Sequence, residues 1–261
     1  MSTDAELLDL ARNGDDAAVE ALLTRHAPMV LRFAHTMCDR PEDADEVAQD
    51  ALITAARALR EVRGERVSSW FYTVTRSFCS KKRRRRKGQP VSTDTLDADV
   101  LRAPQAGPEE ALADRQLGDV LQQAIQELEP KQRAVLLLRD VEGLTAPEVA
   151  EALGIEVATV KTRLHRARAA VREKVAPRLG VQPKPSPSCP EVVERFSRYL
   201  EGDIGPRECE RMQAHVDSCP ACSAACQSLR QTISLCRVSP EPTPEVVAQV
   251  RKALRVVLGK L

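Results

Sequence analysis

The stretch from Leu144 to Arg172 constrains the fold more than any other part of the chain. Thr145 suits a helix N-cap, and Gly154 suits the left-handed residue that ends a helix. After Gly154, apolar residues recur at helical spacing: Val160, Leu164, Ala167 and Val171. The opposite face of this second helix carries basic residues: Lys161, Arg163, His165, Arg166, Arg168 and Arg172. The pattern predicts a helix-turn-helix whose second helix enters a DNA major groove; the alternative is an ordinary helix pair with a solvated basic face.

Composition favours an all-α fold. Aromatic residues make up only 3% of the 261 residues, whereas alanine, leucine, glutamate and arginine are abundant. Strands draw on aromatic and β-branched residues, so helices are expected throughout. The net charge of +1 conceals segregated patches, basic at 81–87 and 161–172 and acidic at 39–50 and 94–99. Local patches of this kind set the attraction to nucleic acid.

Proline-rich breaks divide the chain. We expect domains at 1–88, 109–180 and 189–236, linkers at 89–108 and 181–188, and a terminal amphipathic helix at 245–261. We expect no signal peptide and no membrane-spanning helix, because no apolar run approaches roughly 18 residues. A cytoplasmic protein is predicted; binding of the last helix to a membrane surface is the less favoured alternative to docking within the chain.

Two segments of the first domain carry possible binding residues. The helix expected from Pro41 to about Leu59 has an exposed polar stripe: Asp43, Asp45, Glu46, Gln49 and Asp50. This stripe is either a solvated face or a docking face for a basic partner. The segment 69–76 combines aromatic residues with Arg76 and precedes the basic run 81–87. Rings and cations together suit single-stranded nucleic acid, although the rings also suit a helical core.

The cysteines indicate metal chemistry. Of eight cysteines, Cys38 and Cys79 are expected to be buried thiols, and the others fall between 189 and 236. His215, Cys219 and Cys222 are spaced i, i+4 and i+7, so they converge where a helix enters a turn, and Cys189 supplies a fourth ligand from a preceding helix. Three thiolates and one imidazole suit Zn²⁺.

Three further cysteines remain: Cys209, Cys226 and Cys236. They are either incidental buried thiols or a second, sensing site that shares Cys219 or Cys222. Thiolates select soft metals, so Zn²⁺ or Cd²⁺ is favoured as the sensed ion, and copper is the alternative.

Taken together, these motifs resemble the extracytoplasmic-function (ECF) sigma factors. The segment 43–51 is similar to the family's acidic helix, which implies docking on the β′ clamp helices of core RNA polymerase, with the β flap as a further contact. The segment 69–77 and the basic run resemble the helix that melts the −10 element, which implies contacts from Trp70, Tyr72, Arg76, Lys81, Lys82, Arg83 and Arg84. The segment 128–168 resembles the domain that reads the −35 element, which implies contacts from Thr159, Lys161, Thr162, Arg163, His165, Arg166 and Arg168. Promoter DNA is then the second partner, and the chain is not an enzyme.

The tail from Cys189 to Cys222 resembles the zinc-binding anti-sigma fold, here fused to the sigma factor. The resemblance implies self-inhibition in place of a separate anti-sigma factor, with the helix at 245–261 as the inhibitory wedge. If the fused tail inhibited the factor at all times, no signal could relieve the inhibition. Metal binding is therefore expected to turn the factor on, by freeing residues 160–172 to reach DNA. The alternatives are a thiol-redox-regulated sigma factor and a zinc-stabilised helix-turn-helix repressor.

Overall fold

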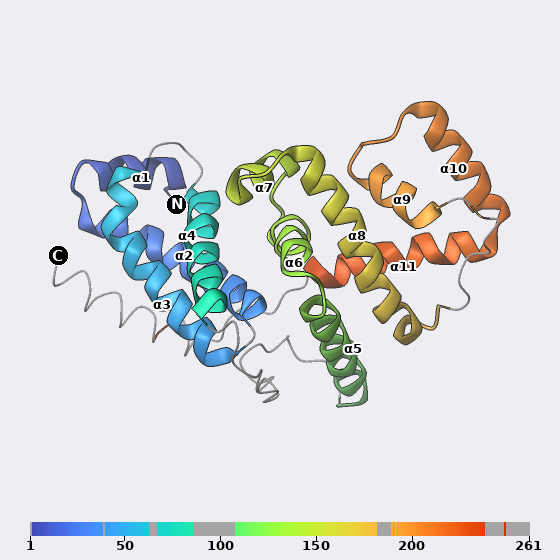
Figure 1. Ribbon diagram of the computed structural model, residues 1–261, viewed down its shortest axis with the longest axis horizontal. Coiled ribbons are helices and arrows are strands. Elements are labelled where there is room, and N and C mark those ends of the chain that lie inside the picture. Colours follow the sequence, from blue (N-terminus) through green and yellow to red (C-terminus); the bar gives the residue numbers. More distant parts are fainter. Residues whose placement is uncertain are drawn as a thin grey trace. The chain divides into compact units, whose positions relative to one another are not determined.

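The protein is an assembly of helices and turns. The computed structural model describes residues 2–38, 40–62, 67–85, 108–181, 189, 191–237 and 248, and within these ranges it has helices and no strand (Figure 1). The all-α expectation is confirmed. The helix expected at 245–261 and most of both expected linkers lie outside the described residues. The described residues fall in two compact units, with 2–85, 151–153 and 248 in one and 108–150 and 154–237 in the other, and each is described by itself.

The first unit contains α1 (Asp4–Arg12), α2 (Asp16–Met37), α3 (Pro41–Ala58), a short 3₁₀ turn η1 (Leu59–Glu61) and α4 (Val67–Arg85). Thr3 and Glu6 form a reciprocal capping box on α1. A turn at Gly14, with φ of 94°, separates α1 from α2, and the Asp15 carboxylate caps α2.

The core of the first unit lies where α2, α3 and α4 pack together (Figure 1). Phe33 of α2 and Tyr72 of α4 meet edge to face, with ring centroids 5.3 Å apart. Cys38 and Cys79 are both buried, with their sulfurs 3.5 Å apart. The hydrogen bond from Cys38 and burial raise the pKa of Cys79, which keeps that thiol protonated. The prediction that both cysteines are buried is confirmed.

The second unit begins with α5 (Pro108–Gln126) and α6 (Pro130–Leu136). Pro130 occupies the first turn of α6, where its missing N–H is tolerated. The apolar run that follows would suit a continuation of the same α-helix. Instead, a π-helical turn η3 (Leu137–Val141) follows α6 and turns Asp140 inward, where it is 1% exposed.

The helix-turn-helix is formed by α7 (Ala146–Leu153) and α8 (Val157–Val175). Thr145 and Glu148 form the capping box of α7, and Gly154 has φ of 61°. The predicted inward residues of α8, which are Val160, Leu164, Ala167 and Val171, are all fully buried. A short 3₁₀ turn η4 (Ala176–Leu179) closes α8. The predicted helix-turn-helix is therefore confirmed as a local structure.

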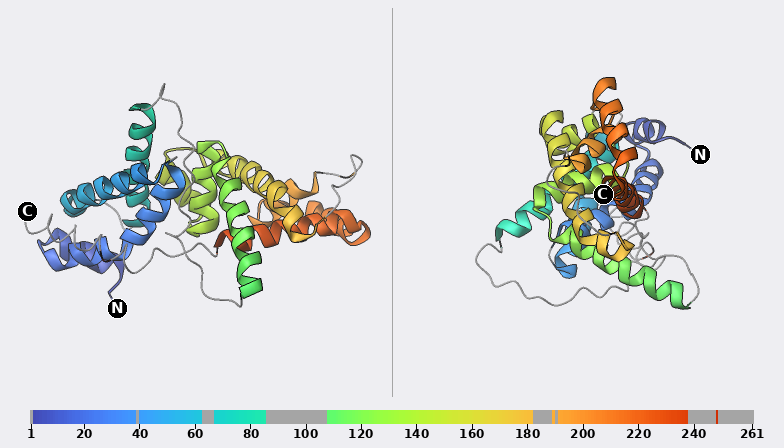
Figure 2. Two further views of the ribbon diagram at one scale, coloured as in Figure 1. Left: turned by 90° about the horizontal axis from the view of Figure 1, so that it is seen from below. Right: turned by 90° about the vertical axis from the view of Figure 1, so that its right-hand side faces the viewer.

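We call residues 189–237 the cysteine-rich module; it contains α9 (Val192–Leu200), α10 (Pro206–Ser218) and α11 (Pro220–Arg237). The sequence predicted it as a separate domain, but it belongs to the same compact unit as α8. Both α9 and α11 contact α8, and α11 crosses α8 in the views of Figures 1 and 2. Among the described residues, no helix is long and apolar enough to cross a membrane.

Candidate metal centre and DNA-recognition helix

The four predicted metal ligands come together at one end of the cysteine-rich module. The ligand atoms of Cys189, His215, Cys219 and Cys222 all lie within 4.8 Å of one another. The Sγ atoms of Cys189 and Cys219 are 4.0 Å apart, and His215 Nε2 is 3.1 Å from Cys222 Sγ. Zinc–sulfur bonds of about 2.3 Å in a tetrahedron place sulfurs roughly 3.8 Å apart, so the spacing fits Zn²⁺.

A tight helix–helix corner produces this convergence. His215 lies in the last turn of α10, Cys219 caps that helix, and Pro220 starts α11 at once, so Cys222 returns toward His215. Cys189 completes the group from the segment that precedes α9. The sequence expected Cys189 to come from a helix. That expectation is wrong, because α9 begins only at Val192.

The four donors differ in acidity. Hydrogen bonds from the backbone and thiol of Cys222 lower the pKa of Cys219, which favours a thiolate there. Burial, with hydrogen bonds to Cys189 and Cys219, raises the pKa of Cys222 to about 12. A metal would therefore displace a proton from Cys222, so metal binding is expected to be pH-dependent. This soft donor set fits a thiophilic divalent ion and not a hard cation such as Mg²⁺.

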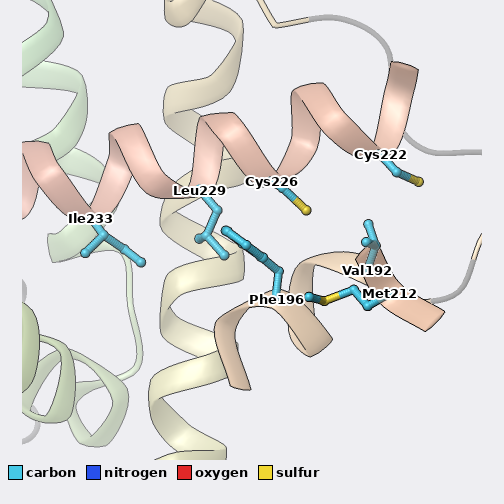
Figure 3. Close-up of a cluster of buried hydrophobic side chains, with 7 residues drawn as sticks. All are labelled: Val192, Phe196, Met212, Cys222, Cys226, Leu229 and Ile233. Carbon is cyan, nitrogen blue, oxygen red and sulfur yellow. The ribbon is translucent and has the colours of Figure 1, made fainter. Parts of the chain in front are cut away.

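A hydrophobic cluster joins the metal-binding end to the rest of the module. Phe196 of α9 points toward Cys226 and Leu229 of α11, and Cys222 extends from the start of α11 (Figure 3). Val192, Met212 and Ile233 complete this cluster, with Cys189 and Cys219 packed against it. The metal-binding end therefore shares one packed core with α9 and α11.

The three remaining cysteines are not part of the four-ligand group. Cys209 is half-buried on α10, whereas Cys226 and Cys236 are buried at separate positions along α11. Burial raises the pKa of Cys226 to about 11 and that of Cys236 to about 12. Within the described residues, only Cys189, His215, Cys219 and Cys222 form a group able to hold a metal, so a second sensing site stays a prediction.

The predicted DNA-reading residues of α8 divide into two sets. Thr162 and Arg166 are exposed, and three others are partly exposed: Thr159, Lys161 and Arg163. His165 and Arg168 are 8% and 2% exposed, so they do not form the solvated basic face that the sequence indicated. The reason is that the cysteine-rich module and η3 pack against this side of α8.

Arg168 is the centre of a buried ionic network. It donates to both carboxylate oxygens of Asp140 at 2.8 and 2.5 Å and to Glu201 at 2.8 Å. Arg139 donates to the other oxygen of Glu201 at 2.9 Å. Burial lowers the pKa of Arg168, but the hydrogen bonds and charges of Asp140 and Glu201 outweigh it and leave the pKa raised.

Further polar contacts attach the module to α8. Lys161 forms an ion pair with Asp203, and Arg172 donates to the Ala225 carbonyl at 3.1 Å and the Ser228 hydroxyl at 2.6 Å. His165 Nδ1 lies 2.8 Å from the Ser197 hydroxyl. A groove of about 530 Å³ remains between α8 and α9, lined by polar residues that include Thr162, Arg166 and Arg198.

The predicted polymerase-docking stripe is largely exposed. Asp45, Glu46, Gln49 and Asp50 lie on the surface of α3. Asp43 is the exception: it is 7% exposed and lies 3.6 Å from Lys82 of α4. It occupies the first turn of α3, where it faces α4, so the expectation that it belongs to the exposed stripe is wrong.

The predicted −10 residues on α4 are also divided. Lys81 and Arg84 are exposed, and four others are partly exposed: Trp70, Arg76, Lys82 and Arg83. Lys82 also pairs with Glu46, and Arg83 donates to the Met37 carbonyl at 2.9 Å. Tyr72 is only 1% exposed, so its ring belongs to the core and is not available to stack on a base. Of the two roles expected for the aromatic residues, nucleic-acid stacking or core packing, Tyr72 has the core-packing role.

Sequence reasoning missed four residues that contact the helix-turn-helix: Asp140, Ser197, Glu201 and Asp203. A carboxylate within the apolar run 135–141 was a signal for Asp140, because a buried charge needs a partner. The other three follow from tertiary packing between α8 and α9, which one sequence does not specify.

Three family models match this chain. Residues 22–89 match the model described as "Sigma-70 region 2", and residues 118–171 match "Sigma-70, region 4". Residues 189–223 match a model described as "Putative zinc-finger". The matched ranges cover the acidic helix, the helix-turn-helix and all four metal ligands.

Named relatives of this chain are also sigma factors. The chain is 31% identical to the ECF RNA polymerase sigma factor SigE of Mycolicibacterium smegmatis over 166 residues, which cover 62% of this chain and 65% of that protein. It is 33% identical to the ECF sigma factor SigM of Mycobacterium tuberculosis over 168 residues, 64% of this chain and 82% of that protein. A solved structure of CnrH in complex with the cytosolic domain of CnrY has a TM-score of 0.47 at 23% identity, covering 66% of this chain and 96% of that chain. The chain therefore belongs to the extracytoplasmic-function family of RNA polymerase sigma factors, which are transcription initiation factors and not enzymes.

Proposed function

We propose that this sigma factor directs core RNA polymerase to a specific set of promoters only when metal binding to its own cysteine-rich module permits it. Zn²⁺ or Cd²⁺ is the favoured ion, and copper is the alternative. The observation that carries the proposal is that α9 and α11 pack against the proposed DNA-recognition helix α8. The candidate ligand Cys189 precedes α9, and the candidate ligand Cys222 lies in α11.

The module takes the place of a separate anti-sigma factor. It covers His165 and Arg168 and pairs with Lys161, three residues proposed to read the −35 element. A helix with neighbouring elements packed against part of its proposed reading face does not fit a major groove. The arrangement described here is therefore the inactive one.

Metal regulation follows from linkage. An ion shifts the equilibrium between docked and released arrangements only by its difference in affinity for the two. A shift from 1:99 to 99:1 needs about 5.5 kcal/mol of differential binding, and several metal–thiolate bonds supply such energies. Metal binding is expected to favour the released arrangement and turn the factor on.

The first test is transcription in vitro with core polymerase and the purified chain. Activity is compared after treatment with a chelator and after addition of Zn²⁺, Cd²⁺ or Cu⁺, and the bound metal is measured by elemental analysis. We expect a metal-dependent rise that Cys219→Ser abolishes and that Cys209→Ser, on α10 outside the four-ligand group, leaves unchanged. Equal activity under all metal conditions would contradict the proposal.

The redox alternative rests on two observations. Cys189 and Cys219 have sulfurs 4.0 Å apart, and the pKa of Cys219 is lowered by its hydrogen bonds with Cys222. An oxidant could join the two as a disulfide and remove both from the metal site. A response to diamide without a response to metal would favour this alternative. The repressor alternative left the segments 43–50 and 70–76 unexplained, and the match to region 2 accounts for both.

A further inference from the structure

We infer that residues 201–203, which we call the acidic turn, stand in for DNA phosphates and hold the cations of the −35-reading domain while the module is docked. The inference rests on the proposed function and specifies how the module inhibits. It assigns to Glu201 and Asp203 a role in competing directly with promoter DNA.

The charge pairing is the first support. Glu201 accepts from both Arg139 and Arg168, and Asp203 pairs with Lys161. The Glu201 and Asp203 side chains are only 4% and 14% exposed, so both carboxylates are largely withdrawn from solvent. A carboxylate that accepts charge-assisted hydrogen bonds from arginine or lysine reproduces the geometry and sign of a phosphate oxygen.

Lys161 is the cation for which the competition is most direct. Its side chain is 36% exposed and lies next to exposed Thr162 on the proposed reading face. In the part of the chain that the structure describes, Asp203 is its one ion-pair partner. Arg168 differs, because Asp140 of its own domain holds it as well. When the module leaves, Lys161 is released to a phosphate and Arg168 stays with Asp140.

Steric exclusion acts with the charges. Ser197 of α9 covers His165, and α11 contacts Arg172 at the far end of the same helix face. A duplex approaching α8 from this side meets α9 before it meets the base-reading residues. The acidic turn follows directly from α9, so α9 and the turn leave α8 together.

The same helix connects the acidic turn to the metal site. Cys189 precedes the start of α9, and the acidic turn follows its end. Phe196, near the middle of α9, packs in the cluster that contains Cys222. A change in ligand geometry that tilts or shifts α9 therefore moves the acidic turn relative to Lys161.

Asp203→Asn tests the inference in the full chain bound to core polymerase. Promoter affinity is measured in chelator over a series of salt concentrations. We expect roughly tenfold tighter binding than wild type, the factor corresponding to one lost charge-assisted hydrogen bond in the docked state. The slope of log affinity against log salt should equal that of wild type, because Lys161 reaches a phosphate in both DNA-bound complexes.

Matched variants make the outcome decisive. Glu210→Gln removes the same charge from an exposed position on α10 and should leave affinity and slope unchanged. Asp203→Glu keeps the carboxylate and should retain inhibition. If Asp203→Asn binds promoter no better than wild type, or if Glu210→Gln improves binding equally, the inference is overturned.

The outcome is separable from that of the proposed function. Asp203→Asn is tested without metal, whereas the proposed function is tested by adding metal to wild type. If Asp203→Asn binds promoter more tightly but wild type does not respond to metal, the role of the acidic turn is supported and metal control is contradicted. If wild type responds to metal but Asp203→Asn binds promoter as wild type does, metal control is supported and the role of the acidic turn is contradicted.

Discussion

At the scale of single residues, Arg168 belongs to the structure of its domain more than to its DNA surface. It is 2% exposed and is held by Asp140 from η3 and by Glu201 from the module. Removing one partner of a buried ion pair leaves an uncompensated charge, which typically costs about 3–5 kcal/mol. Arg166, two residues away, is exposed, so the two arginines have different functions although the sequence placed them on one face.

A pair of substitutions separates these roles. We expect Arg168→Met to lower the unfolding free energy of the second unit by about 3 kcal/mol, because Asp140 is left buried and unpaired. Arg166→Met should change stability by less than about 0.5 kcal/mol and weaken promoter binding. Chemical denaturation and promoter-binding assays measure the two effects. Equal stability of the two variants would show that the Arg168 network is not structural.

His165 gives the module a pH dependence. His165 Nδ1 lies 2.8 Å from the Ser197 hydroxyl, which also accepts a hydrogen bond from Arg168 at 3.2 Å. Burial lowers the pKa of His165, and Arg168 lowers it further, whereas Glu194, Asp203 and Glu201 raise it. The docked state thus binds the proton less well than the released state.

The sign follows from linkage. The released imidazole titrates near pH 6.5, so docking is strongest above that value and weakens as the pH falls through 6.5 toward the lower docked pKa. We expect promoter affinity of the metal-free protein to rise on acidification from pH 7.5 to 6, and His165→Asn to flatten this profile. The His165 ring resonances in NMR report its pKa directly, which distinguishes it from His26 in the first unit, whose pKa burial also lowers. An unshifted His165 pKa would contradict the argument.

At the scale of elements, the helix-turn-helix could be predicted from sequence because its determinants are local. Helical spacing predicted the four buried residues of α8, and Thr145 and Gly154 marked the ends of α7. The metal ligands on α10 and α11 were predictable for the same reason, since only seven positions separate His215 from Cys222. Local spacing also predicted the exposed acids of α3, apart from Asp43.

The remaining features depend on contacts between distant segments. Burial of His165, Arg168 and Tyr72 results from neighbours that lie far away in sequence. An amphipathic pattern shows which face is polar, but it does not show whether that polar face is solvated or paired. The π-helical turn at η3 was missed because its residues are all compatible with an ordinary α-helix.

The turn between α7 and α8 provides a test at this scale. Gly154 has φ of 61°, and a Cβ added at this position would meet no atom within 4 Å. Only backbone strain opposes a side chain, so Gly154→Ala should destabilise the second unit by about 1–2 kcal/mol. Gly118→Ala, in α5 and equally unobstructed, should stabilise it by about 0.5–1 kcal/mol, since alanine favours a helix interior. Thermal melts of the two variants measure opposite shifts, and a shift of the same sign in both would refute the role of Gly154.

At the scale of the whole molecule, the proposed regulation is a balance between two partners for one surface. In this proposal the acidic turn, which pairs with Lys161, competes with promoter DNA for that cation. A metal held by Cys189, His215, Cys219 and Cys222 would influence the balance through α9 and α11, which pack against α8. Coupling between two such sites is reciprocal, so anything that weakens docking must change metal affinity by the corresponding factor.

Metal titration of Asp203→Asn measures this coupling and its sign. If metal favours the released arrangement, part of the metal-binding energy in wild type is used to undock the module. The apparent metal affinity of wild type is then the affinity of the released arrangement multiplied by the fraction of molecules that are released. Asp203→Asn removes that cost, so we expect it to bind Zn²⁺ or Cd²⁺ more tightly than wild type in competition with a chromogenic chelator. The gain cannot exceed the factor by which metal raises wild-type promoter affinity, and Glu210→Gln should show none. Weaker metal binding by Asp203→Asn would mean that metal stabilises the docked arrangement and represses the factor, and unchanged binding would mean that the metal site and the acidic turn act independently.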